Sequence, residues 1–86
     1  MINSEQIRAA RQLLRITADD LANLSGVGVA TIRRYELMSG VPSGNARSVE
    51  AIQLALEAGG VEFIGTPEDR PGVRLTKKYS ILRNEP

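Results

Sequence analysis

The chain has 86 residues, 42% of them hydrophobic and 24% charged, which is enough for one domain with a modest core. It has no cysteine and no histidine, so disulfides, thiolate metal sites and Ser-His or Cys-His catalysis are excluded within this chain. The net charge is +1, from 11 basic and 10 acidic side chains. Any binding to nucleic acid must therefore come from the local placement of Arg and Lys.

No stretch approaches the roughly 18 consecutive apolar residues that a membrane span requires. The N-terminal residues MINSEQIRAARQLL lack the basic start and the apolar core of a signal peptide. The carboxylates are scattered, and no glycine-rich loop matches a nucleotide-binding motif. We therefore expect a cytoplasmic protein that needs no metal or other cofactor and is not an enzyme.

Residues 3–15 are predicted to form the first helix. Asn3 is a favoured N-cap, and Gln6 stands at the matching position of a capping box. We interpret Arg8 and Arg15 as part of a solvated flank of this helix. The predicted buried stripe consists of Ile7, Ala10, Leu13 and Leu14.

The stretch TADDLANLSGVGVATIRRYE, residues 17–36, is predicted to form two short helices joined by a tight turn. Thr17 is a good N-cap, and Asp20 can complete its capping box. Gly26 permits the positive φ that ends the first helix, and the second follows over about residues 28–35. The residues expected to face the core are Leu21, Ala22 and Leu24, Val27 at the corner, and Ile32 and Tyr35.

Residues 37–45, LMSGVPSGN, are typical of a loop. We expect Leu37 and Met38 to anchor this loop to the core. A fourth helix is predicted from about Asn45 to Ala58, capped by Ser43 or Asn45. Its buried face consists of Val49, Ile52, Ala55 and Leu56, and Gly59 and Gly60 end it.

Residues 61–76 alternate as two strands, VEFIG and GVRLT, joined by the polar loop TPEDRPG. We predict an antiparallel hairpin that packs on the fourth helix or on the edge strand of a second protomer, since a lone hairpin is marginal in water. Val61, Phe63, Val73 and Leu75 are expected to face inward. Residues 77–86 are predicted to be a mobile tail, and we interpret Lys77, Lys78 and Arg83 as solvated rather than bound to phosphate.

The spacing of Ala22, Gly26 and Ile32 resembles the helix-turn-helix of the Cro/cI-like (XRE-type) transcriptional regulators. The alternative is a plain helical hairpin with no role in nucleic-acid binding. The resemblance extends over about residues 3–75 and implies a mainly α, lambda-repressor-like DNA-binding domain of four or five helices. This domain would occupy residues 1–60, with the hairpin 61–76 as its extension. The resemblance also implies a bacterial or phage source.

The resemblance implies that the second helix of the motif enters the major groove of DNA. The residues it assigns to base edges are Gly28, Val29, Ala30, Thr31 and Arg33, of which Arg33 is the strongest candidate. Arg34 is assigned to phosphate or solvent. Further phosphate contacts are assigned to Thr17, Ser43, Gly44, Asn45 and Arg47. The resemblance also implies a structural ion pair between Arg11 and Glu36.

Some residues depart from the family pattern. Ala18 stands where the family usually has Gln, the recognition helix begins with the apolar Gly28-Val29-Ala30, and Gly40 lies further from Glu36 than is usual. Our prediction is a sequence-specific transcriptional regulator of double-stranded DNA that acts as a homodimer on a two-fold operator. The alternative is an antitoxin-like or adaptor module whose apolar recognition face grips a protein partner.

Overall fold

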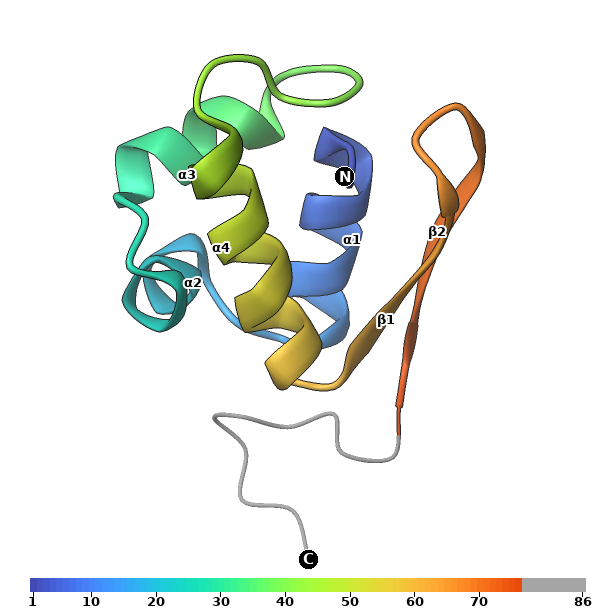
Figure 1. Cartoon of the computed structure of the whole chain (residues 1–86). Helices are drawn as coiled ribbons and strands as arrows, with labels where there is room; N and C mark the ends of the chain where they lie inside the picture. Colours follow the sequence, from blue (N-terminus) through green and yellow to red (C-terminus); the bar gives the residue numbers. More distant parts are fainter. Residues whose placement is uncertain (77–86) are drawn as a thin grey trace, which may run out of the picture.

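The computed structural model describes residues 1–76, which form four helices followed by an antiparallel hairpin (Figure 1). The helices are α1 (Ser4–Leu13), α2 (Ala18–Ser25), α3 (Val29–Glu36) and α4 (Ala46–Ala58), and the strands are β1 (Val61–Thr66) and β2 (Asp69–Leu75). The predicted fold class is confirmed. The predicted tail, with Lys77, Lys78 and Arg83, lies outside the described residues. Within residues 1–76, no helix is long and apolar enough to cross a membrane.

The helices begin where short polar side chains cap them. Asn3 Oδ1 accepts from Gln6 N at 2.8 Å, and Gln6 Oε1 accepts from Asn3 N at 3.0 Å, which completes the predicted capping box of α1. Of the two candidate caps of α4, Asn45 makes the bond, from Arg47 N to Asn45 Oδ1 at 2.9 Å. α1 ends earlier than predicted, because Arg15 adopts φ 59° and the chain turns to bury Ile16.

The core lies among the four helices, with α1 and α2 each packing on both α3 and α4. It is aliphatic apart from Tyr35, which is fully buried. Three residues that were predicted to face the core are exposed: Leu24, Leu37 and, in the hairpin, Leu75. Leu24 is 37% exposed, because the buried stripe of α2 follows Leu21 and Ala22 instead. Leu37, the C-cap residue of α3, is 88% exposed. Met38 packs against the core as predicted.

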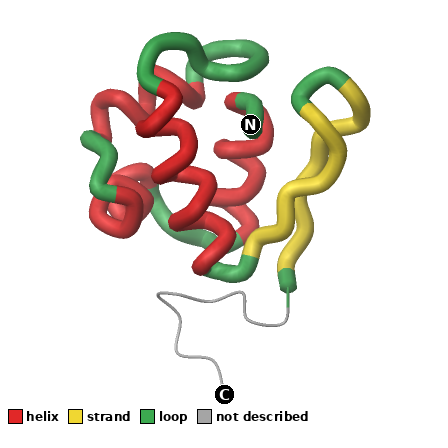
Figure 2. The backbone as a smooth tube through the Cα atoms, viewed as in Figure 1, coloured by secondary structure: helices red, strands yellow, loops and turns green. Residues whose placement is uncertain are grey.

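The hairpin packs on α1 as well as on the predicted α4, and lies on the side of α1 away from α2 and α3 (Figure 2). The side-chain amide of Gln6 donates to the carbonyl oxygens of Ile64 and Gly72, at 3.3 and 3.0 Å. Core packing of the hairpin comes from Val61, Phe63 and Val73. Leu75 was predicted to face inward but is 38% exposed, because the hairpin is held at Phe63 and Val73 instead.

The connection between the strands is shorter than the predicted polar loop. The turn is made by Pro67 and Glu68 alone, so that Asp69 already belongs to β2. A β-bulge lies between Ile64 and Thr66. Its central residue, Gly65, has φ 75°, and a Cβ atom there would lie 2.2 Å from the carbonyl oxygen of Arg70. The strands approach so closely at this point that only glycine fits.

Candidate nucleic-acid interface

The corner between α2 and α3 is built by local signals. Asp20 N donates to Thr17 Oγ1 at 3.0 Å, and Thr17 N donates to Asp20 Oδ2 at 2.9 Å, so the capping box of α2 is formed. Gly26 ends α2 with φ 78°, a left-handed conformation that glycine adopts without strain. Val27 is buried directly after it, as predicted. The chain therefore reverses within a short turn and begins α3 at Val29.

α3 has one buried side and one exposed side. Ile32 and Tyr35 have no exposed area, and Glu36 is 9% exposed. These buried residues fix the rotation of the helix about its own axis, so its opposite side faces outward. Of the predicted base-contacting residues, Gly28, Ala30 and Arg33 are exposed, and Val29 and Thr31 are half-buried.

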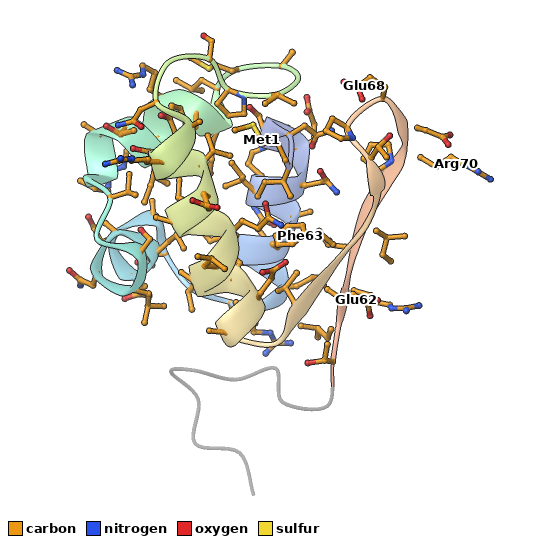
Figure 3. The ribbon with its side chains drawn as sticks, in the orientation of Figure 1. Met1, Glu62, Phe63, Glu68 and Arg70 are labelled. Atoms are coloured by element: carbon orange, nitrogen blue, oxygen red, sulfur yellow. The ribbon has the colours of Figure 1, made fainter. Side chains whose placement is uncertain are left out.

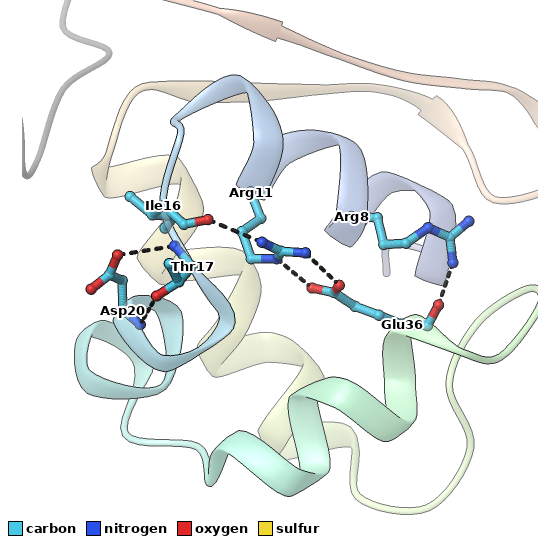
Figure 4. Close-up of polar contacts among 6 residues, drawn as sticks. All are labelled: Arg8, Arg11, Ile16, Thr17, Asp20 and Glu36. Carbon is cyan, nitrogen blue, oxygen red and sulfur yellow. Dashed lines mark hydrogen bonds and ion pairs between the residues drawn. The ribbon is translucent and has the colours of Figure 1, made fainter.

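A bidentate ion pair holds the end of α3 to α1 (Figure 4). Arg11 Nε lies 2.8 Å from Glu36 Oε2, and Arg11 Nη2 donates to Glu36 Oε1 at 2.9 Å. Arg11 Nη1 also donates to the carbonyl oxygen of Ile16 at 3.0 Å. The hydrogen bond to Glu36 raises the pKa of the Arg11 guanidinium above its ordinary value. The structure thus contains the ion pair that the family resemblance implied.

Arg8 also reaches the end of α3, where its Nη1 donates to the carbonyl oxygen of Glu36 (Figure 4). The prediction that Arg8 is a solvated flank residue was wrong, because the last carbonyl groups of a helix need donors from outside it. Its spacing of three from Arg11, which places both side chains on one side of α1, was the available signal. Arg15 is exposed, as predicted.

These features agree with a comparison against known families. A family model described as Helix-turn-helix matches residues 7–45, from α1 to the cap of α4. Residues 7–45 form a helix-turn-helix domain of the Cro/cI-like (XRE) type. Domains of this type bind DNA, and the family is not a catalytic one. A search of curated proteins found no match.

In this helix-turn-helix domain, the predicted phosphate contacts lie at the starts of two helices. Thr17 precedes α2, and the exposed residues Ser43, Gly44, Asn45 and Arg47 lie at the start of α4, after the loop that leaves α3. Asn45 Oδ1 accepts from Arg47 N, and the carbonyl oxygen of Asn45 accepts from Ser48 N at 3.1 Å, so neither acceptor uses the N–H group of Ala46, the first residue of α4. Such groups are suited to an anion.

Sequence reasoning missed one relationship within the helix-turn-helix domain. Asp19 Oδ2 lies 3.7 Å from Arg33 Nη2, so an acidic residue at the start of α2 stands beside the strongest base-contacting candidate on α3. The two residues are fourteen apart in the sequence, and only the crossing of the two helices brings them together. Arg34 instead lies over the ring of Tyr35, with its guanidinium carbon 5.5 Å from the ring centroid.

Proposed function

We propose that this protein is a sequence-specific transcriptional regulator that binds double-stranded DNA as a homodimer and reads the major groove with α3. The observation that supports this most is the fixed rotation of α3. Ile32, Tyr35 and Glu36 hold one side against the core, and the side that carries Arg33 faces outward. The major groove of B-DNA is wide enough to accept a helix presented in this way.

The side chains of α3 suggest how bases are read. Arg33 can donate two hydrogen bonds to O6 and N7 of a guanine, which is the commonest specific contact in the major groove. Val29 and Ala30 offer apolar surface to thymine methyl groups, and Thr31 offers one hydroxyl. Because α3 has few hydrogen-bonding side chains, part of the specificity is expected to come from DNA shape.

Phosphate contacts would hold the domain in register on the duplex. The candidates are Thr17 before α2 and Ser43, Gly44, Asn45 and Arg47 at the start of α4, which are all exposed. Backbone N–H groups at helix starts bind phosphate oxygens whatever the base sequence of the DNA. These residues would therefore position α3 on the duplex, and Arg33 would discriminate between base sequences.

The edge of β2 is our candidate for the surface that joins two protomers. Thr76 N donates to the carbonyl oxygen of Gly60 at 2.7 Å, so Thr76 and Gly60 form a hydrogen-bonded pair. Hydrogen-bonded and non-hydrogen-bonded pairs alternate along an antiparallel ladder. The N–H and C=O groups of Val73 and Leu75 therefore point away from β1. An edge of this kind is available to a second strand. Pro71 lacks an N–H group, so a second strand that pairs along this edge loses one hydrogen bond of the ladder at Pro71.

A cleft beside this edge supports the same proposal. It has a volume of about 170 Å³ and lies between α1 and β2, with Ala9 on one wall and Pro71 and Val73 on the other. If two copies of β2 pair antiparallel about Val73, Leu75 of each protomer lies opposite Pro71 of the other and can enter this cleft. Arg74 then lies opposite the partner's Gly72, and the two arginines do not oppose each other.

The test is selection from a pool of random duplex DNA, with sequencing of the bound fraction at two salt concentrations. An enriched palindrome would support a dimeric regulator and would give its half-site spacing, and phosphate contacts would make affinity fall steeply with salt. No enrichment at either salt would contradict DNA reading. It would favour a protein partner that binds the apolar start of α3, from Gly28 to Ala30.

A further inference from the structure

Asp19 and Arg33 form an ion pair between α2 and α3 on the exposed side of the helix-turn-helix. Their nearest charged atoms are 3.7 Å apart, and the side chains are 68% and 62% exposed. This distance is too long for a directed hydrogen bond. The guanidinium is therefore attracted to the carboxylate but is free to move to another acceptor.

The fold does not depend on this pair. The cap of α2 is made by Thr17 and Asp20, so Asp19 has no part in it. α3 is held through Ile32, Tyr35 and Glu36, and so does not rely on Arg33. An exposed ion pair of this kind contributes little to stability, because water and salt screen it. The pair is therefore expected to affect how Arg33 binds a molecule that approaches it from solvent.

A nearby carboxylate affects the two kinds of DNA contact differently. A phosphate that approaches Arg33 brings a second negative charge close to Asp19, and the two anions repel each other. The O6 and N7 atoms of guanine carry no formal charge, so Arg33 can donate to them while Asp19 remains close. The carboxylate therefore disfavours the phosphate contact more than the base contact.

We propose that Asp19 is a specificity-determining residue, a counter-ion of Arg33 that weakens binding to non-target DNA more than binding to the target. The proposal rests on the function proposed above and adds a residue to it. Phosphate contacts supply essentially all of non-specific affinity. A residue that weakens the phosphate contacts of Arg33 raises the ratio of specific to non-specific affinity without making any contact with a base.

The experiment compares Asp19→Asn with the wild-type chain on two duplexes, the selected palindrome and a scrambled duplex of the same composition. Fluorescence anisotropy over a range of salt concentrations gives the affinities. We expect Asp19→Asn to bind the scrambled duplex about fivefold more tightly, as removal of one such repulsion in water predicts, and the palindrome less than twofold more tightly. Circular dichroism should show a melting temperature lowered by no more than a few degrees, because Asp19 also lies in the first turn of α2, where a negative charge favours the helix dipole.

The matched control is Glu68→Gln, which makes the same change in charge. Glu68 is exposed in the turn of the hairpin, on the far side of α1 from α3 (Figure 3). This variant should change both affinities equally and only slightly. If Asp19→Asn behaves like Glu68→Gln, or tightens both duplexes by the same factor, the proposal is wrong.

A double-mutant cycle separates the ion pair from general repulsion of DNA. Placed on an Arg33→Ala background, Asp19→Asn should tighten binding to the scrambled duplex less than it does on the wild-type background. The same gain on both backgrounds would show that Asp19 acts without Arg33 and would overturn the proposal. Failure of the wild-type chain to bind either duplex would instead reject the function on which the proposal rests.

Discussion

Arg33 is the residue on which the proposed reading of bases depends most. Arg33→Ala removes the guanidinium that would donate to O6 and N7 of a guanine. We expect it to weaken binding to the selected duplex by about 1–3 kcal/mol and to relax the preference at one base pair. Binding titrations with single-base-pair variants of that duplex measure both effects. Arg70→Ala, which removes an exposed guanidinium from the hairpin, is the control, and an equal loss in both variants would exclude Arg33 from base reading.

Glu36 joins the end of α3 to α1 through Arg11. The two side chains are only 10% and 19% exposed, so removal of one leaves the other charge poorly solvated. We expect Glu36→Ala to lower the free energy of unfolding by about 2–4 kcal/mol in urea denaturation. The double variant Arg11→Met/Glu36→Leu leaves no unpaired charge and should lose less. A Glu36→Ala protein as stable as the wild type would contradict a structural role for the pair.

The sequence predicted the existence and the buried side of α3, but it did not predict the contacts of each residue on the exposed side. Helical spacing identified Ile32 and Tyr35 as buried, because burial follows the helical period. It did not distinguish the surroundings of Arg33 from those of Arg34, since both are exposed neighbours. Their partners, Asp19 and the ring of Tyr35, depend on how α2 crosses α3 and on side-chain direction.

At the level of elements, the helix starts were predictable because capping is local. The box of Asn3 with Gln6 and that of Thr17 with Asp20 each involve residues three apart, and both are formed. Exposure was harder to predict, because it depends on elements that pack from elsewhere in the chain. Leu75 follows the alternation of its strand, and yet the packing of the hairpin leaves it 38% exposed.

Gly65 is the position at which the hairpin is most sensitive to substitution. A Cβ atom there would lie 2.2 Å from the carbonyl oxygen of Arg70, and the φ of 75° is itself unfavourable for other residues. We expect Gly65→Ala to lower the free energy of unfolding by about 2 kcal/mol or more. Gly72→Ala is the control, because its Cβ would lie 4.0 Å from that of Ile64. Equal melting temperatures for the two variants would contradict this account.

At the scale of the whole molecule, the helix-turn-helix and the hairpin occupy opposite sides of α1 (Figure 1). A dimer formed through β2 would therefore leave the exposed side of α3 free for DNA. Val61 is 2% exposed and belongs to the core, so a charge placed there would test folding rather than dimerisation. Leu75, at the exposed edge of β2, is the better position for a test.

Leu75→Glu should convert the proposed dimer into a monomer in sedimentation velocity, because the new carboxylate would be placed against Ala9, Pro71 and Val73 and in the same cleft as Glu5. Loss of the second half-site should weaken binding to the palindrome by about a hundredfold or more. Leu54→Glu makes the same change at a position on α4 that is 60% exposed and should leave both properties unchanged. A Leu75→Glu protein that sediments as a dimer would exclude this edge as the interface.

The side chain of Gln6 has a consequence for the order in which the protein can fold during synthesis. Its amide donates to the carbonyl oxygens of Ile64 and Gly72, which are 58 and 66 residues later in the chain. α1 leaves the ribosome before its partners in the hairpin, which are among the last of the described residues. The DNA-binding motif can therefore form while translation continues, whereas α1 acquires its full set of contacts only when the hairpin emerges.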